Sequence, residues 1–475
     1  MSAIHIKTIN GREYAYEIES IWDKEKKKSR KRSKYLGRVI DKENCIYEKR
    51  RPDQHQEFQK SLILNFGDTY CIMKTFEKSS YYQLFCSLLP GLSDTLLSLI
   101  CYKLIKSSAM QYANTWYTGN YASVLFKDAD LTSQRVSDFY RLLGCEKVWR
   151  KFFKEYLEKT ITPQAAVIID STGLPNEIDF HLSAWGRHGG KSEMETRLLM
   201  VVDKESHMPL YFRYMAGNIV DVSTLVNTVE ELRKFDVQTT FALIDAGYFS
   251  EDNIVGLFKS NISFLTRLPA NRTLFKSLIE DHSINLEIAE NMIIYGKRAL
   301  FVKPIPVDLF GYSAFAYVVC DIRRKGSEST NYMISAKEDG LSVDEINKGL
   351  IYKGKLVLIS SVKIPAEEII PLYYTRQSAE NIFGISKSAL DILPVRVHTI
   401  ETFRGYLMLN FLTLIVYLEL KKHLMAKYTV EGALMEMSNL VCKIFGDSIL
   451  IQELTKNMKE ICSLLHVMVP KSLGV

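Results

Sequence analysis

The spacing of apolar residues divides the chain into regions with different predicted secondary structure. Residues 11–22 alternate between apolar and polar side chains, and residues 35–40 repeat this spacing, which is typical of β-strands. From about residue 56 to residue 160, apolar residues recur at helical spacing instead. The pattern therefore predicts an N-terminal β-hairpin followed by a helical region.

Beyond residue 165 the pattern mixes strands and helices. Short apolar runs predict strands and segments of helical spacing predict helices, in the order β-β-β-α-β-α-β. Residues 268–362 interrupt this order with strand-like segments, and residues 366–389 return to helical spacing. An α/β fold with a mixed sheet is therefore expected. Its predicted strands are residues 165–169, 197–203, 209–215, 240–244 and 262–267, its helices are 221–235 and 251–259, and the later strand-like segments are 292–302, 313–322 and 355–361.

Length and composition are those of a folding chain with several domains. The 475 residues suffice for about three folded units, and 47% of them are apolar. The eight cysteines have no metal-binding spacing, which predicts reduced thiols in a cytoplasmic protein. The longest apolar run, residues 407–418, is too short to span a bilayer, so we expect a buried helix and no membrane partner.

Positive charge is concentrated near the N-terminus. The net charge of +6 is modest, but eight of the eleven residues from Lys24 to Lys34 are basic. Clustered Lys and Arg neutralise nucleic-acid phosphates without reading bases, so this predicted hairpin tip is a candidate DNA contact. A solvated loop or a localisation signal is the alternative. The basic residues are Lys24, Lys26, Lys27, Lys28, Arg30, Lys31, Arg32 and Lys34.

Two aspartates each follow an apolar run. Asp170 ends the context Ile-Ile-Asp and Asp245 ends the context Leu-Ile-Asp. If the two strands are parallel neighbours, both carboxylates emerge at the same edge of the sheet, where ligands bind in open α/β folds. Alternatively, each aspartate is only a helix cap or a turn residue.

The predicted helix at residues 366–389 carries a third candidate group. Tyr373, Arg376, Glu380 and Lys387 fall within about 60° of one another around an ideal helix axis. One face would then present a phenol, a guanidinium, a carboxylate and an ammonium. The alternative is a solvated stripe stabilised by an ion pair between Arg376 and Glu380.

These residues resemble the Y-R-E-K signature of a large group of bacterial insertion-sequence DDE transposases. Other segments are similar to that family's sequence blocks and follow in the same order, so that the resemblance covers about residues 165–405. The blocks are Ile-Asp-Ser-Thr-Gly at 169–173, Gly217-Asn218 followed by Asp221, Asp245-Ala-Gly-Tyr248 and Phe264-Leu-Thr-Arg267.

The resemblance implies an RNase H-like core in which Asp170, Asp245 and Glu380 form the DDE triad. Three carboxylates at close range repel one another unless cations neutralise them, and Mg²⁺ or Mn²⁺ prefers such oxygen ligands. Two ions would therefore be bound as cofactors and would assist phosphodiester cleavage and strand transfer.

The same resemblance implies that Tyr373, Arg376 and Lys387 hold DNA phosphates near the end of the element. It also implies a β-rich insertion between Asp245 and Glu380. Some relatives trap a flipped base with a tryptophan of this insertion, but all four tryptophans of this chain lie outside it. An aromatic side chain would have to stack in its place. The candidates are Tyr295, Phe310 and Tyr312.

The expected fold is an RNase H-like mixed sheet flanked by helices. The expected function is that of a bacterial transposase that binds double-stranded DNA, at element ends and target, as a homodimer associated with the nucleoid. The alternatives are an inactive DNA-binding derivative and a nuclease that does not join strands. The predicted domains are a basic hairpin region at 1–55, a helical DNA-binding domain at 56–160, the catalytic core at 161–268 and 363–425, the β-rich insertion at 269–362 and a helical region at 426–475.

Overall fold

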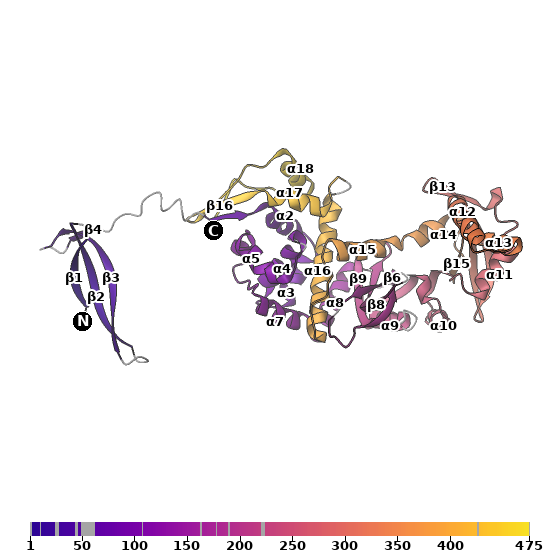
Figure 1. The fold of residues 1–475 in the computed structure, drawn as a ribbon, viewed down its shortest axis with the longest axis horizontal. Coiled ribbons are helices and arrows are strands. Elements are labelled where there is room, and N and C mark those ends of the chain that lie inside the picture. Colours follow the sequence, from indigo (N-terminus) through magenta and orange to yellow (C-terminus); the bar gives the residue numbers. More distant parts are fainter. Residues whose placement is uncertain are drawn as a thin grey trace. The chain divides into compact units, whose positions relative to one another are not determined.

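The computed structural model divides the chain into two compact units (Figure 1). The first comprises residues 1–63, 443–450 and 474, and the second comprises residues 64–442, 451–473 and 475. The finer domain boundaries remain predictions. The described residues are 2–9, 11–23, 28–42, 46–48, 62–106, 108–161, 164–176, 178–188, 191–219, 224–424 and 427–474.

The N-terminal part of the first unit is an antiparallel sheet in the order β1-β2-β3-β4. Its strands are β1 (Ser2–Ile9), β2 (Arg12–Asp23), β3 (Lys28–Asp41) and β4 (Ile46–Glu48). Strands β2 and β3 form the predicted hairpin.

The location of the basic residues differs from the prediction, because β3 begins earlier than the sequence pattern indicated. Most of them lie in a paired strand rather than in the loop at the tip. Lys34 is opposite Glu17 and Arg32 is opposite Glu19 in β2, and opposite charges at facing positions stabilise such pairing. Lys28, Arg30 and Lys31 also lie in β3, whereas Lys26 and Lys27 lie outside the described residues.

The second unit begins with the predicted helical region. In α7 (Ser133–Leu143) the buried residues Val136, Phe139, Tyr140 and Leu143 recur at helical spacing and form one apolar face. The other elements are α2 (Gly67–Phe76), α3 (Tyr82–Leu88), α4 (Ser93–Ile105), η1 (Met110–Tyr112), α5 (Ala113–Thr118), α6 (Ala122–Leu125) and α8 (Glu146–Thr160).

A ten-stranded mixed sheet forms the centre of the second unit. Its order is β12-β13-β14-β15-β11-β10-β6-β8-β7, and β9 pairs with β8. Strand β10 is parallel to β6 and β11, and the other pairs are antiparallel, so the predicted mixed sheet is confirmed. The sequence pattern did not predict β7 (Ala184–His188). The elements up to β11 are β6 (Gln164–Pro175), β8 (Lys191–Asp203), β9 (Pro209–Ala216), α9 (Leu225–Arg233), β10 (Gln238–Ile244), η3 (Ala246–Tyr248), α10 (Glu251–Lys259) and β11 (Ser263–Arg267).

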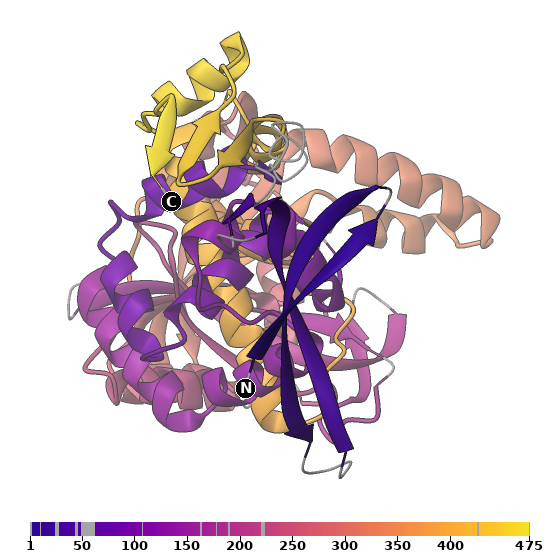
Figure 2. The same ribbon diagram turned by 90° about the vertical axis from the view of Figure 1, so that its left-hand side faces the viewer.

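The strands of the predicted insertion extend the central sheet. Strand β15 (Lys355–Ser360) is buried throughout and pairs with β11 on one side and β14 on the other. The insertion also contains helices that the strand-like pattern did not indicate, including the contacting helices α12 and α13 (Figure 2). Its elements are α11 (Thr273–His282), η4 (Ala289–Asn291), β12 (Met292–Tyr295), β13 (Arg298–Leu309), β14 (Tyr312–Asp321), α12 (Ile322–Glu338) and α13 (Val343–Leu350).

The helix predicted over residues 366–389 is broken in the middle. It consists of α14 (Ala366–Tyr374) and α15 (Gln377–Ser388), with a turn at Thr375 and Arg376. Around this turn the backbone amide of Arg376 donates to the carbonyl oxygen of Tyr373, three residues earlier, rather than four. The single helical face expected for the signature residues is therefore wrong.

Helix α16 (Ile400–Leu424) lies between the helical region and the sheet of the second unit (Figure 1). It is long and apolar enough to cross a membrane, but 83% of its most apolar window is buried inside the fold. A helix in the core of a folded unit is as apolar as a helix that crosses a membrane. The prediction of a buried helix is confirmed. The remaining elements are α17 (Val430–Ser438), α18 (Lys456–Leu464) and the strands of a third sheet, β18 (Ser472–Gly474), β17 (Ser448–Ile451), β16 (Val441–Phe445) and β5 (Leu62–Asn65).

Candidate active site

Strands β6 and β10 place two of the predicted acids side by side. The strands are parallel neighbours, and Ile169 is opposite Ile244. The next residues, Asp170 and Asp245, therefore lie at the same level, as the apolar runs predicted. However, β6 does not end at Asp170, because it continues in pairing with β8, where Asp170 is opposite Met200.

One guanidinium group joins the two aspartates to the third acid. Arg376 Nη1 lies 3.3 Å from Asp170 Oδ2 and 3.2 Å from Asp245 Oδ1. Arg376 Nη2 donates a hydrogen bond of 2.6 Å to Glu380 Oε1. The three acids come from β6, the loop after β10 and the first turn of α15. They are thus brought together around a single cationic side chain.

The side chains of the site differ in their exposure to solvent. The side chain of Asp170 is 11% exposed and that of Arg376 is 19% exposed, whereas that of Glu380 is 50% exposed. Burial raises the pKa of Asp170 to about 7; Arg376 opposes this shift, and the charges of Asp245 and Glu380 add to it. Burial lowers the pKa of Arg376, but the neighbouring acids outweigh burial and raise it overall. Burial and the neighbouring acids therefore oppose ionisation of Asp170, and Arg376 favours it.

The donor set fits divalent metal ions that prefer oxygen ligands. Three carboxylates meet at one place, and their charges require a cation. In the described part of the chain, no group of three His, Cys, Asp or Glu side chains is already arranged to hold a metal ion. The guanidinium of Arg376 is the cation that the acids contact instead.

Lys387 lies on the same face of β6 as the triad. Its Nζ donates a hydrogen bond of 2.7 Å to Thr172 Oγ1, and Thr172 is two residues after Asp170 in β6. Residues two apart in a strand point to the same face. Burial lowers the pKa of Lys387, and Glu195 opposes this shift. The ammonium is thus held beside the acids.

Tyr373 lines a pocket next to the triad. Its ring is buried at the end of α14, and burial raises the pKa of its hydroxyl. The pocket is about 180 Å³ in volume and is also lined by Arg376 and Glu380. Two further basic residues in its wall, Arg267 and Arg324, were not predicted as site residues. Arg267 is the last residue of the block Phe264-Leu-Thr-Arg267, and this position could have identified it as a site residue. Arg324 lies near the start of α12, a helix that the sequence pattern did not predict.

The three aromatic residues proposed to replace the missing tryptophan already pack against protein rings. The ring of Tyr295 stacks on that of Tyr374 with centroids 5.3 Å apart, and Tyr312 stacks on Phe258 at 4.5 Å. The ring centroid of Phe310 lies 6.2 Å from that of Phe249. A DNA base could stack on one of these rings only if the contact between the two protein rings broke, or if the base used a ring face that the protein leaves open.

The chain is similar to a known protein family and to a solved structure. A family model described as a transposase DDE domain matches residues 162–416. Among solved structures, a piggyBac transposase synaptic complex with hairpin DNA is similar to this chain, with 10% sequence identity and a TM-score of 0.39. That similarity covers 82% of this chain and 71% of the other. No curated protein sequence matches the chain.

Proposed function

The chain belongs to the transposase DDE domain family, and from this membership we propose that it is a DNA transposase whose catalytic acids are Asp170, Asp245 and Glu380. The observation that carries the assignment is the contact of all three acids with the guanidinium of Arg376. Residues from three segments far apart in the sequence meet there. A helix cap, a turn or an isolated ion pair would not require such convergence.

The proposed cofactors are two Mg²⁺ or Mn²⁺ ions bound by these acids. The chemistry that such ions supply is activation of the attacking water or 3′-hydroxyl and stabilisation of the leaving oxygen. The three acids would hold the cations, and Asp170 would do so from within the paired strand β6. Because Arg376 and a cation compete for the same carboxylates, Arg376 would turn to a DNA phosphate when cations bind.

Basic side chains around the triad would position the DNA backbone. Lys387 lies along β6, and Arg267 and Arg324 line the neighbouring pocket. Lysine and arginine at such places bind phosphates without reading sequence. We further propose that the chain belongs to the Y-R-E-K group, binds the terminal inverted repeats of its own insertion sequence, and acts as a cytoplasmic homodimer on double-stranded DNA.

Replacement of single acids tests the triad. The purified full chain is incubated with Mg²⁺ and labelled DNA from both flanks of its coding region. In Asp170→Asn, Asp245→Asn and Glu380→Gln, we expect cleavage to fall by about 10³-fold or more while DNA binding persists. Glu368→Gln, an exposed acid of α14, is the matched control and should cleave normally. Normal cleavage by any triad variant would refute that residue's assignment.

Strand joining distinguishes a transposase from a related nuclease. The same reaction with a supercoiled target plasmid should yield products in which end DNA is covalently joined to the plasmid. Cleavage without joining would favour the nuclease. Binding without cleavage by the wild type would favour an inactive derivative, although the presence of all three acids argues against it.

A further inference from the structure

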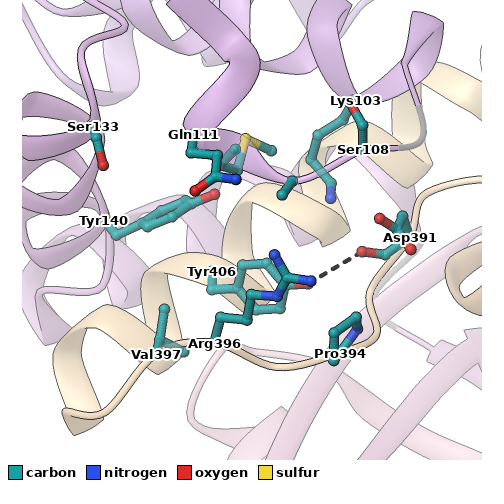
Figure 3. Close-up of a pocket in the computed structure, with 12 residues that line it drawn as sticks. Lys103, Ser108, Gln111, Ser133, Tyr140, Asp391, Pro394, Arg396, Val397 and Tyr406 are labelled. Atoms are coloured by element: carbon teal, nitrogen blue, oxygen red, sulfur yellow. Dashed lines mark hydrogen bonds between the residues drawn. The ribbon is translucent and has the colours of Figure 1, made fainter.

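A second candidate site lies in a pocket of the second unit that contains none of the predicted site residues. The pocket has a volume of about 260 Å³. Helices α4, α7 and α16 contribute to its wall, together with η1 and the segment that follows α15 (Figure 3). Its polar lining includes Lys103, Tyr140, Asp391 and Arg396.

Lys103 brings a buried positive charge to this pocket. Only 5% of the residue is exposed, and in the described part of the chain its ammonium group has neither a hydrogen-bond acceptor nor an ion-pair partner. Its Nζ lies over the ring of Tyr406, 5.5 Å from the ring centroid. Burial lowers the pKa of Lys103 to about 8, and Asp391 opposes this shift. Such a group is costly to bury unless an acceptor satisfies its three donors.

Tyr140 adds a second donor without a partner. Its hydroxyl is buried and makes no hydrogen bond to any residue that the structure describes. The neighbouring Tyr406 differs, because its hydroxyl proton is shared between two carbonyl oxygens, that of Ile392 at 2.8 Å and that of Asp391 at 3.2 Å. Tyr406 thus anchors the wall segment, while Tyr140 keeps its hydroxyl proton free for another acceptor.

Arg396 supplies a second cation at the mouth of the pocket. It is exposed, and no ion pair joins it to a described acid. Asp391 is the single carboxylate of the lining, and it makes no ion pair with Lys103 or Arg396 within 4.0 Å. Two cations and one carboxylate leave the lining with an excess of positive charge. The pocket is therefore suited to a negatively charged ligand with several acceptor atoms.

We propose that this pocket binds a phosphate-type oxyanion through Lys103, Arg396 and the hydroxyl of Tyr140. A tetrahedral oxyanion has enough acceptor oxygens to satisfy donors that come from different elements. The volume also leaves room for a group attached to the phosphate. The oxyanion has two available sources, free phosphate and a phosphate of a DNA strand.

Binding of inorganic phosphate to the full chain tests the proposal. Isothermal titration is performed in EDTA, so that divalent ions do not contribute, and at constant ionic strength set with chloride. Wild type should bind phosphate, and Lys103→Met should weaken binding about tenfold or more, since a lost hydrogen bond to a charged group costs about 1.5–3 kcal/mol. Arg396→Gln should weaken it too, and this exposed position leaves the core intact. No binding by wild type would overturn the proposal.

A matched control separates the pocket from other basic sites. Lys147→Gln removes an exposed lysine of α8 that does not line the pocket, and it should bind phosphate as wild type does. Equal loss in all three variants, or no loss in Lys103→Met and Arg396→Gln, would assign phosphate to another place and contradict the proposal.

Competition identifies the source. Short single-stranded oligonucleotides with and without a 5′-phosphate are added to the phosphate titration. If an oligonucleotide displaces phosphate and its own affinity falls in Arg396→Gln, the ligand is a DNA phosphate. If neither displaces it, the ligand is a free phosphate-class ion. Both results support an oxyanion pocket and choose between the sources.

Discussion

Arg376 neutralises a cluster of acids that would otherwise repel one another. Its guanidinium contacts Asp170, Asp245 and Glu380, and Asp170 is the most buried of the three. A buried carboxylate is stable only when protonated or paired with a cation. The catalytic acids and this arginine are therefore coupled, and both should affect folding as well as activity.

The pKa of Asp170 predicts how stability depends on pH. The pKa of Asp170 is about 7 in the folded state, above the ordinary value of 3.8 for this side chain. The folded state therefore binds more protons, and the stability that Asp170 contributes is lost as pH rises from about 4 through 7. In EDTA, wild type should lose about 2 kcal/mol of unfolding free energy between pH 5 and pH 8 relative to Asp170→Asn. Urea unfolding measures this, and Glu368→Gln should retain the wild-type slope.

Arg376→Gln tests the coupling directly. In EDTA at pH 8 it should lower the free energy of unfolding by about 2–4 kcal/mol, because it leaves the buried carboxylate without its cation. In the Asp170→Asn background the same substitution should cost much less. Urea unfolding of wild type, the two single variants and the double variant gives the interaction energy between Arg376 and Asp170. Additive losses would mean that Arg376 stabilises the fold by other contacts.

At the scale of elements, α7 and α16 pack closely enough to require glycine. A Cβ at Gly405 would overlap the backbone carbonyl of Tyr140, and a Cβ at Gly144 would overlap that of Glu401. Because the overlapping atoms belong to the backbone in both cases, the two helices could not make room by turning a side chain. The approach of α7 to α16 also sets the wall of the oxyanion pocket, since Tyr140 and Tyr406 come from these helices.

Two glycine-to-alanine substitutions should have opposite effects. Gly405→Ala gains helix propensity of about 1 kcal/mol, but the overlap should outweigh it and lower the free energy of unfolding by about 2 kcal/mol. Gly384 lies inside α15, and a Cβ there meets nothing within 4 Å, so Gly384→Ala should stabilise by about 0.5–1 kcal/mol. Thermal unfolding compares them. A neutral Gly405→Ala would show that the helices separate without cost.

At the scale of the whole molecule, DNA binding should be strongly dependent on salt. Lys31, Arg32 and Lys34 are exposed on β3. If each contacts a phosphate, replacing all three with Gln should reduce the slope of log K against log salt by about 2.7. Fluorescence anisotropy at several salt concentrations measures the slope. Lys42→Gln, which removes an exposed lysine paired with Glu13, is the control and should leave it unchanged. An unchanged slope in the triple variant would mean that β3 makes no phosphate contact.

Local sequence patterns determined much of the site. The apolar runs before Asp170 and Asp245 identified two core strands, and parallel pairing brought the acids to one level. The spacing of four residues indicated that Arg376 could contact Glu380, although it did so as part of the alternative interpretation, a solvated stripe. The apolar run at residues 407–418 predicted a buried helix. These features could be predicted because strand alternation, helical spacing and burial are encoded over a few consecutive residues.

Only the tertiary structure decided which distant segments meet. It joined the insertion strands to the central sheet, broke the predicted helix at Arg376 and directed that side chain to both aspartates. It also enclosed Lys103 in a pocket formed by several elements. Such contacts depend on strand order, helix ends and packing between residues far apart in the chain. A local pattern contains no information about these partners, because their proximity results from the burial of the whole core.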